Sequence, residues 1–223
     1  ALYCPVVGYC QGMSYVAAYL FATTGLGERE AFWMFATLMD KYGLKGLYLP
    51  ELKRLRCICF QLDCCARELD LSAGGEWLEA HAVDSLLFAA SSIQTLFADG
   101  RVMSPAAIAV VWDCLICDGM QSAVLPDGEE KEPPPPLPAR TYALIVRLLL
   151  AMMRRTAPLL DGSSFEAGLS HLQCFAHLGL KDETASRRLV QEALELPVSY
   201  KELARYEREF LRKDAHGRKR KRP

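Results

Sequence analysis

The sequence predicts an all-α protein, a single globular domain of packed amphipathic helices. Apolar residues recur at intervals of three and four along nearly every segment, which is the spacing of one helix face. Residues that cap or terminate helices stand at the ends of these segments. No segment alternates apolar and polar residues as a half-buried strand does, and no internal repeat has a fixed period.

Size and composition fit this class. The chain has 223 residues, of which 51% are hydrophobic and 24% charged, enough for one domain with a real core. Nine cysteines, without the pattern of a small disulfide scaffold, indicate the reduced thiols of an intracellular protein. The net charge of −1 hides an asymmetry: residues 212–223 carry +6, so residues 1–211 carry −7. An acidic body argues against broad nucleic-acid binding.

The first expected helix begins at Met13. Its apolar face is formed by Met13, Val16, Ala17, Leu20 and Phe21. Gln11 stands at the entry to this helix beside Gly12, among backbone N–H groups that have no intrahelical partner. From the residues alone, Gln11 is either a solvated helix-entry residue or a side chain presented to the phosphate chemistry of a partner.

Three further helices follow in order. Residues 28–43 form the second, with a stop at Gly43 and one face made by Phe32, Phe35, Ala36 and Met39. Residues 51–71 form the third, after Pro50, with a stripe made by Leu55, Cys59, Leu62, Ala66 and Leu69. Residues 83–100 form the fourth, with Asp84 as its N-cap and Gly100 as its terminator.

The fifth expected helix has the clearest borders. Ser104 is its N-cap, Pro105 its first helical residue, and Gly119 follows its end. The next helix covers residues 140–155. Between them, residues 120–139 are acidic and proline-rich and cannot hold a helix, so we expect a surface insertion within the one domain.

The C-terminal part is predicted from two capping boxes and a charge run. The boxes pair Ser163 with Glu166 and Ser199 with Glu202. The last helix leads into residues 212–223, which we expect to be a disordered basic tail. Three interpretations of this tail stay open: a nuclear import signal, a segment that binds an anionic membrane surface, or a solvated end.

The residues offer several other candidate chemistries. Cys114 and Cys117 form a C-x-x-C, and four further cysteines cluster at Cys57, Cys59, Cys64 and Cys65. Because both groups lie inside amphipathic helices, we expect core packing in preference to a zinc or thiol site. The chain has no phosphate-binding loop of the Walker type. Asp113, beside Trp112, is expected to orient a hydrogen bond and not to act as a general base.

Two sequence blocks carry a resemblance to a known family. Residues 9–13 read YCQGM, and residues 108–119 read IAVVWDCLICDG. With residues 31–50 and 85–98, in which Ile93 stands where the family usually has Trp, they resemble the TBC-domain family of GTPase-activating proteins for Rab-type small GTPases. The resemblance covers Val6 to about Phe210 and implies the all-α TBC fold.

The resemblance also implies a role for Gln11. In this family the glutamine of the YCQGM element enters the active site of the GTPase and orients the hydrolytic water. The implied partner-binding residues are Tyr9, Cys10, Gly12 and Met13, and the implied structural motif is Trp112, Asp113 and Gly119. The chain is expected to need no metal or cofactor of its own, because GTP and Mg²⁺ are carried by the Rab-family partner. We expect a cytoplasmic protein that reaches endomembranes through its Rab and does not bind nucleic acid.

One departure from the family pattern bears on activity. The family's arginine finger lies in an I-x-x-D-x-x-R element upstream of YCQGM, whereas the first arginine here is Arg29. We therefore expect a TBC domain that lacks its N-terminal part and leaves apolar surface uncovered. Two functions follow: a Rab GTPase-activating protein that uses Gln11 as a glutamine finger, or a catalytically incomplete scaffold that only binds a Rab.

Overall fold

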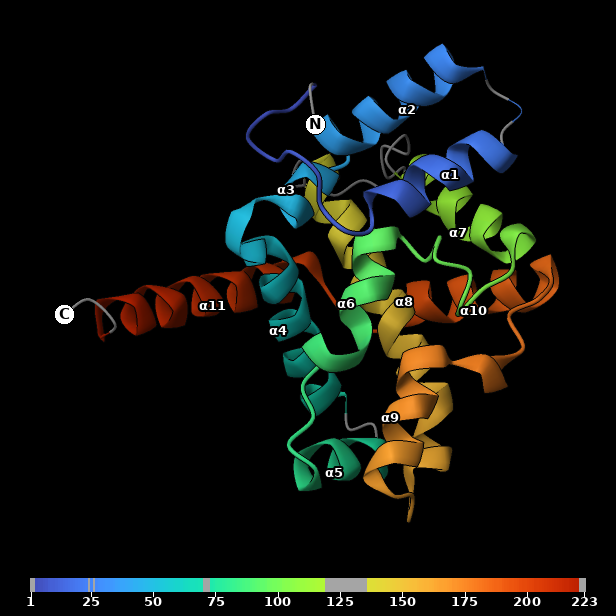
Figure 1. The fold of residues 1–223 in the computed structure, drawn as a ribbon. Helices are drawn as coiled ribbons and strands as arrows, with labels where there is room; N and C mark the ends of the chain where they lie inside the picture. The colour runs from blue at the N-terminus through green and yellow to red at the C-terminus, as the bar shows by residue number, and fades with distance from the viewer. Residues whose placement is uncertain (1–2, 24, 26, 70–72, 119–135, 221–223) are drawn as a thin grey trace, which may run out of the picture.

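The computed structural model describes residues 3–23, 25, 27–69, 73–118 and 136–220. Within these residues the chain is helical and contains no strand, which confirms the all-α prediction (Figure 1). The elements are α1 (Met13–Thr23), α2 (Glu28–Asp40), α3 (Leu44–Tyr48), the 3₁₀ turn η1 (Pro50–Leu52), α4 (Lys53–Glu68), α5 (Ala73–Ala80), α6 (Leu86–Thr95), α7 (Pro105–Asp118), α8 (Leu137–Leu160), α9 (Phe165–Cys174), the 3₁₀ turn η2 (Ala176–Leu178), α10 (Glu183–Glu195) and α11 (Tyr200–Arg220).

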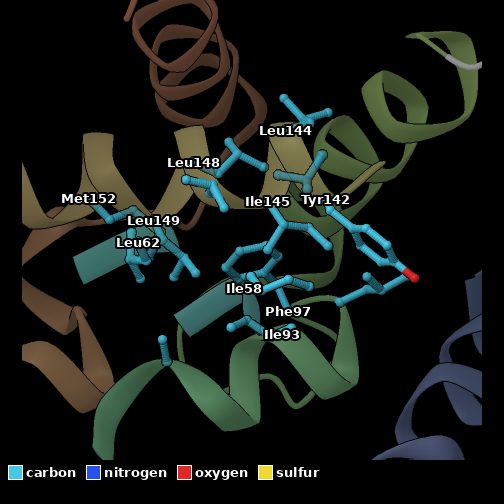
Figure 2. Close-up of a cluster of buried hydrophobic side chains, with 14 of the residues drawn as sticks. Ile58, Leu62, Ile93, Phe97, Tyr142, Leu144, Ile145, Leu148, Leu149 and Met152 are labelled. Carbon is cyan, nitrogen blue, oxygen red and sulfur yellow. The ribbon is translucent and has the colours of Figure 1, made fainter. Parts of the chain in front are cut away.

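Helix α8 is the centre of the core. It contacts α4, α5, α7, α9, α10 and α11, and Figure 1 shows it in the middle of the fold. Figure 2 shows side chains of α4, α6 and α8 gathered into one cluster, which includes Ile58, Leu62, Ile93, Ile145 and Leu149. Each fully buried Leu or Ile stabilises the fold by about 1.5–3 kcal/mol.

The helix caps were predicted with mixed success. Ser104 caps α7 by accepting a hydrogen bond from the Ala107 amide at 3.2 Å. The box at the start of α11 is also confirmed: the Ser199 amide donates to the Glu202 carboxylate at 2.8 Å, and the Glu202 amide donates to the Ser199 hydroxyl at 3.2 Å.

The box that paired Ser163 with Glu166 is wrong by one residue. Ser164 is the N-cap of α9, and its hydroxyl accepts from the Ala167 amide at 3.3 Å. The Ser163 hydroxyl instead donates to the Leu160 carbonyl at 2.9 Å, so this residue completes the turn that ends α8. Two adjacent serines offered the same cap, and the path of the chain after α8 decided between them.

The predicted apolar faces hold for α4 and only in part for α1 and α2. Four residues of the α4 stripe are buried: Leu55, Cys59, Leu62 and Ala66. Phe21 of α1 is 50% exposed and Phe32 of α2 is 43% exposed, so part of each predicted apolar face is open to solvent. Apolar spacing identifies a helix face, but it does not show whether another element covers that face.

The predicted insertion and tail differ from the structure at their edges. Gly119 and most of residues 120–139 lie outside the described residues, but α8 already begins at Leu137. Residues 212–220, assigned to a disordered tail, continue α11 as helix. The reason is tertiary, because Asp214 ion-pairs with Arg56 and, at 3.9 Å, with Lys53 of α4. Figure 1 shows the end of α11 projecting beyond the other helices.

No helix in the described part of the chain has both the length and the apolarity needed to span a bilayer.

Candidate functional site

The YCQGM element forms the turn that leads into α1. Tyr9 is 69% exposed and Gln11 is exposed at the tip of the turn, whereas Gly12 and Met13 are buried beneath it. The element therefore has an outward side, formed by Tyr9 and Gln11, and a side that packs against the body of the protein. Figure 1 shows the beginning of α1 next to the end of α6.

Gly12 allows this close packing. Its φ angle is +105°, in a region that residues with a side chain rarely adopt. A Cβ atom placed on Gly12 would lie only 3.1 Å from the carbonyl oxygen of Gln94 in α6. The turn that presents Gln11 thus rests directly on the last turn of α6, and only glycine satisfies both the backbone angle and the contact.

Cys10 and Met13 fix the shape of the turn from within. The Cys10 amide donates to the Met13 sulfur at 3.4 Å, and the Met13 amide donates to the Cys10 carbonyl at 3.3 Å. The Gln94 side-chain amide donates to the Cys10 sulfur at 3.8 Å. Burial raises the pKa of the Cys10 thiol, so it is neutral at physiological pH. Cys10 therefore acts here as a packing residue.

The end of α6 is itself held by two aromatic side chains. The Tyr48 hydroxyl donates to the Gln94 carbonyl at 2.5 Å, and the Trp112 indole N–H donates to the Leu96 carbonyl at 2.9 Å. Leu96 has a φ angle of +49°, which ends the helix and costs roughly 1–2 kcal/mol for a residue with a side chain. These contacts satisfy carbonyl groups that the helix end leaves without partners.

Trp112 also connects α7 to α1. Its ring lies 4.6 Å from the ring of Tyr19, centroid to centroid, and is 4% exposed. The Tyr19 hydroxyl donates to the Pro105 carbonyl at 3.0 Å. Asp113, the residue after Trp112, is exposed on α7. The buried part of the WD block therefore supports the helix that carries the YCQGM turn.

The structure brings the five residues of the YCQGM element together with two residues that the sequence did not single out, Gln94 and Tyr48. Cys10 and Gln94 are separated by 84 residues along the chain. No local spacing connects them, because their contact exists only once α1 is packed on α6. A glutamine within the otherwise apolar and small-residue helix α6 was the only available signal.

The other candidate chemistries find little support in the geometry. Cys57, Cys59, Cys64 and Cys65 are buried in α4 as expected. Burial raises the pKa of Cys57 and of Cys65 to about 12, so these thiols stay protonated. In contrast to the expected core packing, Cys114 is half-buried and Cys117 is exposed. Among the described residues, no three His, Cys, Asp or Glu side chains lie close enough together to hold a metal ion.

Comparison with known proteins agrees with these features. A family model described as the Rab-GTPase-TBC domain matches residues 1–126, more than half of the chain. Growth hormone-regulated TBC protein 1 of Xenopus laevis is 32% identical over 113 residues, which cover 51% of this chain and 32% of that protein. Rab GTPase-activating protein eat-17 of Caenorhabditis elegans is 32% identical over 117 residues, which cover 51% of this chain and 12% of that protein.

A third relative extends the match toward the C-terminus. Ecotropic viral integration site 5 protein homolog of Homo sapiens is 24% identical over 208 residues, which cover 92% of this chain and 22% of that protein. The matched segments thus span a third or less of the length of these relatives. With the family match over residues 1–126 and the YCQGM turn in place, the chain belongs to the Rab-GTPase-TBC domain family.

Proposed function

We propose that this chain stimulates GTP hydrolysis by a Rab-type small GTPase, and that Gln11 enters the GTPase active site to orient the hydrolytic water. The observation that carries the proposal is the placement of Gln11, exposed at the tip of a turn that is packed from below by Gly12 and Met13. Family membership supports the proposal, and one relative is named a Rab GTPase-activating protein.

The chemistry of a primary amide suits this task. Its carbonyl oxygen accepts a hydrogen bond from the attacking water, and its NH₂ group donates one at the same time. Because the turn is held by Gly12 against α6, the backbone of Gln11 is already in position when the residue acts. The beginning of α1 next to Gln11 adds a potential that favours the negative charge of the phosphates.

The other residues of the element divide into two roles in this proposal. Tyr9, at 69% exposure, contacts the GTPase. Cys10, Gly12 and Met13 are half-buried or buried, so they maintain the shape of the turn more than they line the interface. Trp112 supports the same turn indirectly through Tyr19.

The proposal extends to partners and location. The GTPase brings GTP and Mg²⁺, and this chain supplies only side chains to the reaction. The protein acts in the cytoplasm, in vesicle trafficking, and reaches endomembranes through its membrane-bound Rab. Its contact with the GTPase is a protein–protein interface, and nucleic acid has no part in it.

A second candidate function, a scaffold that binds a Rab without activating it, follows if no arginine finger accompanies Gln11. Residues 1–28 contain no arginine. Arg29 lies at the start of α2, where it pairs with Glu30 at 3.1 Å with its side chain 83% exposed. An arginine finger contributes about 10³–10⁵ in rate, and a neutral amide cannot supply its charge.

Single-turnover GTP hydrolysis by a panel of Rab proteins tests both functions. It compares this chain, the chain extended upstream by an arginine-bearing I-x-x-D-x-x-R segment, and each form with Gln11→Ala. We expect the extended chain to accelerate hydrolysis, and Gln11→Ala to reduce this stimulation by about 10²–10³-fold, the typical cost of removing one preorganised hydrogen-bonding group.

The matched control is Gln191→Ala, which removes an exposed glutamine on α10 and should leave the stimulation unchanged. Binding of a GTP-loaded Rab without stimulation by any form would instead establish the scaffold. Absence of both binding and stimulation across the panel would overturn the proposal.

A further inference from the structure

A fixed arginine lies in the loop between α6 and α7. The Arg101 guanidinium donates to the Asp99 carboxylate from Nε at 3.0 Å and from Nη2 at 2.8 Å, and Nη2 also contacts the Ser91 hydroxyl. The Ser91 hydroxyl donates to the same carboxylate oxygen at 2.9 Å. The Arg101 amide donates to the other Asp99 oxygen at 3.2 Å. Both the backbone and the side chain of Arg101 are therefore held by Asp99.

The two partners differ sharply in exposure. The Asp99 side chain is 3% exposed, whereas the Arg101 side chain is 57% exposed. Among the described residues, no acceptor lies within hydrogen-bonding distance of the Arg101 Nη1 atom. Nη1 is therefore an open donor on a guanidinium whose other nitrogens are held in place, so Arg101 loses little side-chain entropy on binding an anion.

Arg101 lies beside the surface that presents Gln11. Ser91, which contacts Arg101, precedes Gln94 by about one turn of α6, and Gln94 packs against Gly12. Tyr15, in the first turn of the helix that follows Gln11, is 47% exposed. The Asp99 hydrogen bond and charge raise the pKa of Arg101, and the nearby Cys174 and Tyr15 add to this shift.

We infer that Arg101 binds a carboxylate side chain on the surface of the partner GTPase, next to the nucleotide site that Gln11 enters. This inference rests on the function proposed above. With Nε and Nη2 engaged by Asp99 and Ser91, Nη1 is the open donor, and one of its N–H groups makes a charge-assisted hydrogen bond to a carboxylate oxygen. Because Asp99 already offsets part of the charge of Arg101, a singly charged carboxylate suits this group better than a phosphate does.

Two measurements on the arginine-extended chain test the inference. The first is the Kd for a GTPase loaded with a non-hydrolysable GTP analogue, and the second is the single-turnover rate at saturating chain. We expect Arg101→Ala to raise the Kd by about 10- to 100-fold, the typical effect of losing a hydrogen bond to a charged group. The saturated rate should stay unchanged. Gln11→Ala should show the opposite split, with the rate reduced and the Kd nearly unchanged.

Further variants separate recognition from loop structure. Arg101→Lys keeps the charge but loses the guanidinium that Asp99 and Ser91 hold in place, so its Kd should lie between those of wild type and Arg101→Ala. The matched control is Arg187→Ala, an exposed arginine that pairs with Glu183 on α10 and should bind like wild type. Each acidic residue around the nucleotide site of the GTPase is also replaced by asparagine. At one position this replacement should weaken binding to wild type but should not weaken binding to Arg101→Ala any further.

The outcomes distinguish the inference from the proposed function. If Arg101→Ala has the same affinity for the GTPase and the same stimulated rate as wild type, the inference is wrong and the proposed function stays intact. If Arg101→Ala weakens binding and lowers the free energy of unfolding by a similar amount, Arg101 only stabilises the structure of its loop, and the inference is wrong. If wild type neither binds nor stimulates any GTPase, the proposed function fails and the inference fails with it.

Discussion

Gly12 packs directly on Gln94, so that an added Cβ at position 12 would lie 3.1 Å from the Gln94 carbonyl oxygen and 3.2 Å from its Cβ. The same carbonyl oxygen accepts a hydrogen bond from the Tyr48 hydroxyl at 2.5 Å. It therefore cannot move aside without breaking this bond. The position of Gln11 is consequently set by the end of α6, a helix far along the chain.

The first prediction concerns Gly12→Ala. The variant combines backbone strain at a φ of +105° with a contact that α6 cannot relieve. We expect the free energy of unfolding to fall by about 2–4 kcal/mol. Gln11 should be displaced, so the stimulation of GTP hydrolysis should fall as well. Urea denaturation and the hydrolysis assay measure the two effects.

Gly179→Ala is the matched control for this prediction. Gly179 also has a positive φ, +60°, but an added Cβ there would meet no atom within 4 Å. Gly179→Ala should therefore lower the free energy of unfolding by only about 1–2 kcal/mol and leave the stimulation of GTP hydrolysis intact. Equal costs for the two variants would show that the contact with Gln94 does not constrain the turn.

The second prediction concerns Trp112→Phe. The variant removes the hydrogen bond to the Leu96 carbonyl and part of a ring that is 4% exposed. We expect a loss of about 2–4 kcal/mol in the free energy of unfolding, from the cavity and the unsatisfied carbonyl together. Trp33→Phe, at a side chain that is 57% exposed, should change it by less than about 0.5 kcal/mol. Similar losses in both variants would contradict a supporting role for Trp112.

The third prediction concerns the pH dependence of stability. Burial raises the pKa of Asp63, although hydrogen bonds from the Ser85 amide, at 2.9 Å, and the Ser85 hydroxyl oppose this shift. The folded protein then binds this proton more tightly than the unfolded chain does. The resulting stabilisation is full below the unfolded pKa of Asp63 and is lost as the pH rises through its folded pKa.

Asp63→Asn tests this dependence. Wild type should gain stability relative to the variant as the pH falls from 7 toward 4, because only wild type can take up the proton. Urea denaturation at both pH values measures the difference. Asp161→Asn, at an exposed position, controls for the loss of one carboxylate. The opposite sign, with wild type losing stability relative to Asp63→Asn in acid, would contradict a raised pKa.

The fourth prediction concerns the end of α11. Asp214 is 8% exposed and holds the helix to Arg56 and Lys53 of α4. We expect Asp214→Ala to cost about 1 kcal/mol, since both cations keep access to water. Amide hydrogen exchange after Phe210 should become faster. Glu209→Ala removes an exposed pair with Lys213 and should change exchange much less. Unchanged exchange in Asp214→Ala would show that the ion pairs do not anchor the helix.

Much of the helical framework was predictable because helix signals are local. The stripe of α4, the serine and proline that start α7, and the box that starts α11 all depend on residues within one or two turns of each other. Family membership also followed from short blocks, and the match over residues 1–126 confirms it. The YCQGM residues were identified for the same reason, since they are consecutive in the sequence.

Other features depended on neighbours that no local pattern specifies. The exposure of Phe21 and Phe32, the choice of Ser164 over Ser163 as a cap, and the continuation of α11 past residue 212 all follow from what packs nearby. The extension of α8 to Leu160, with Pro158 inside its last turns, belongs to the same class. Pro158 itself is exposed, but Ala157 and Leu160 beside it are buried, and this packing overrides the low helix propensity of proline.

The sequence by itself determined the helical class, the starts of α1, α7 and α11 and the residue proposed to act on the GTPase, because periodicity, capping and a five-residue motif are properties of adjacent residues. Only the tertiary structure decided that Gly12 rests on Gln94, that Trp112 supports α1 through Tyr19, and that Asp99 fixes an exposed Arg101 nearby. The first two relationships join residues from distant parts of the chain, and the third depends on burial within a loop. They exist only after the helices have packed around α8.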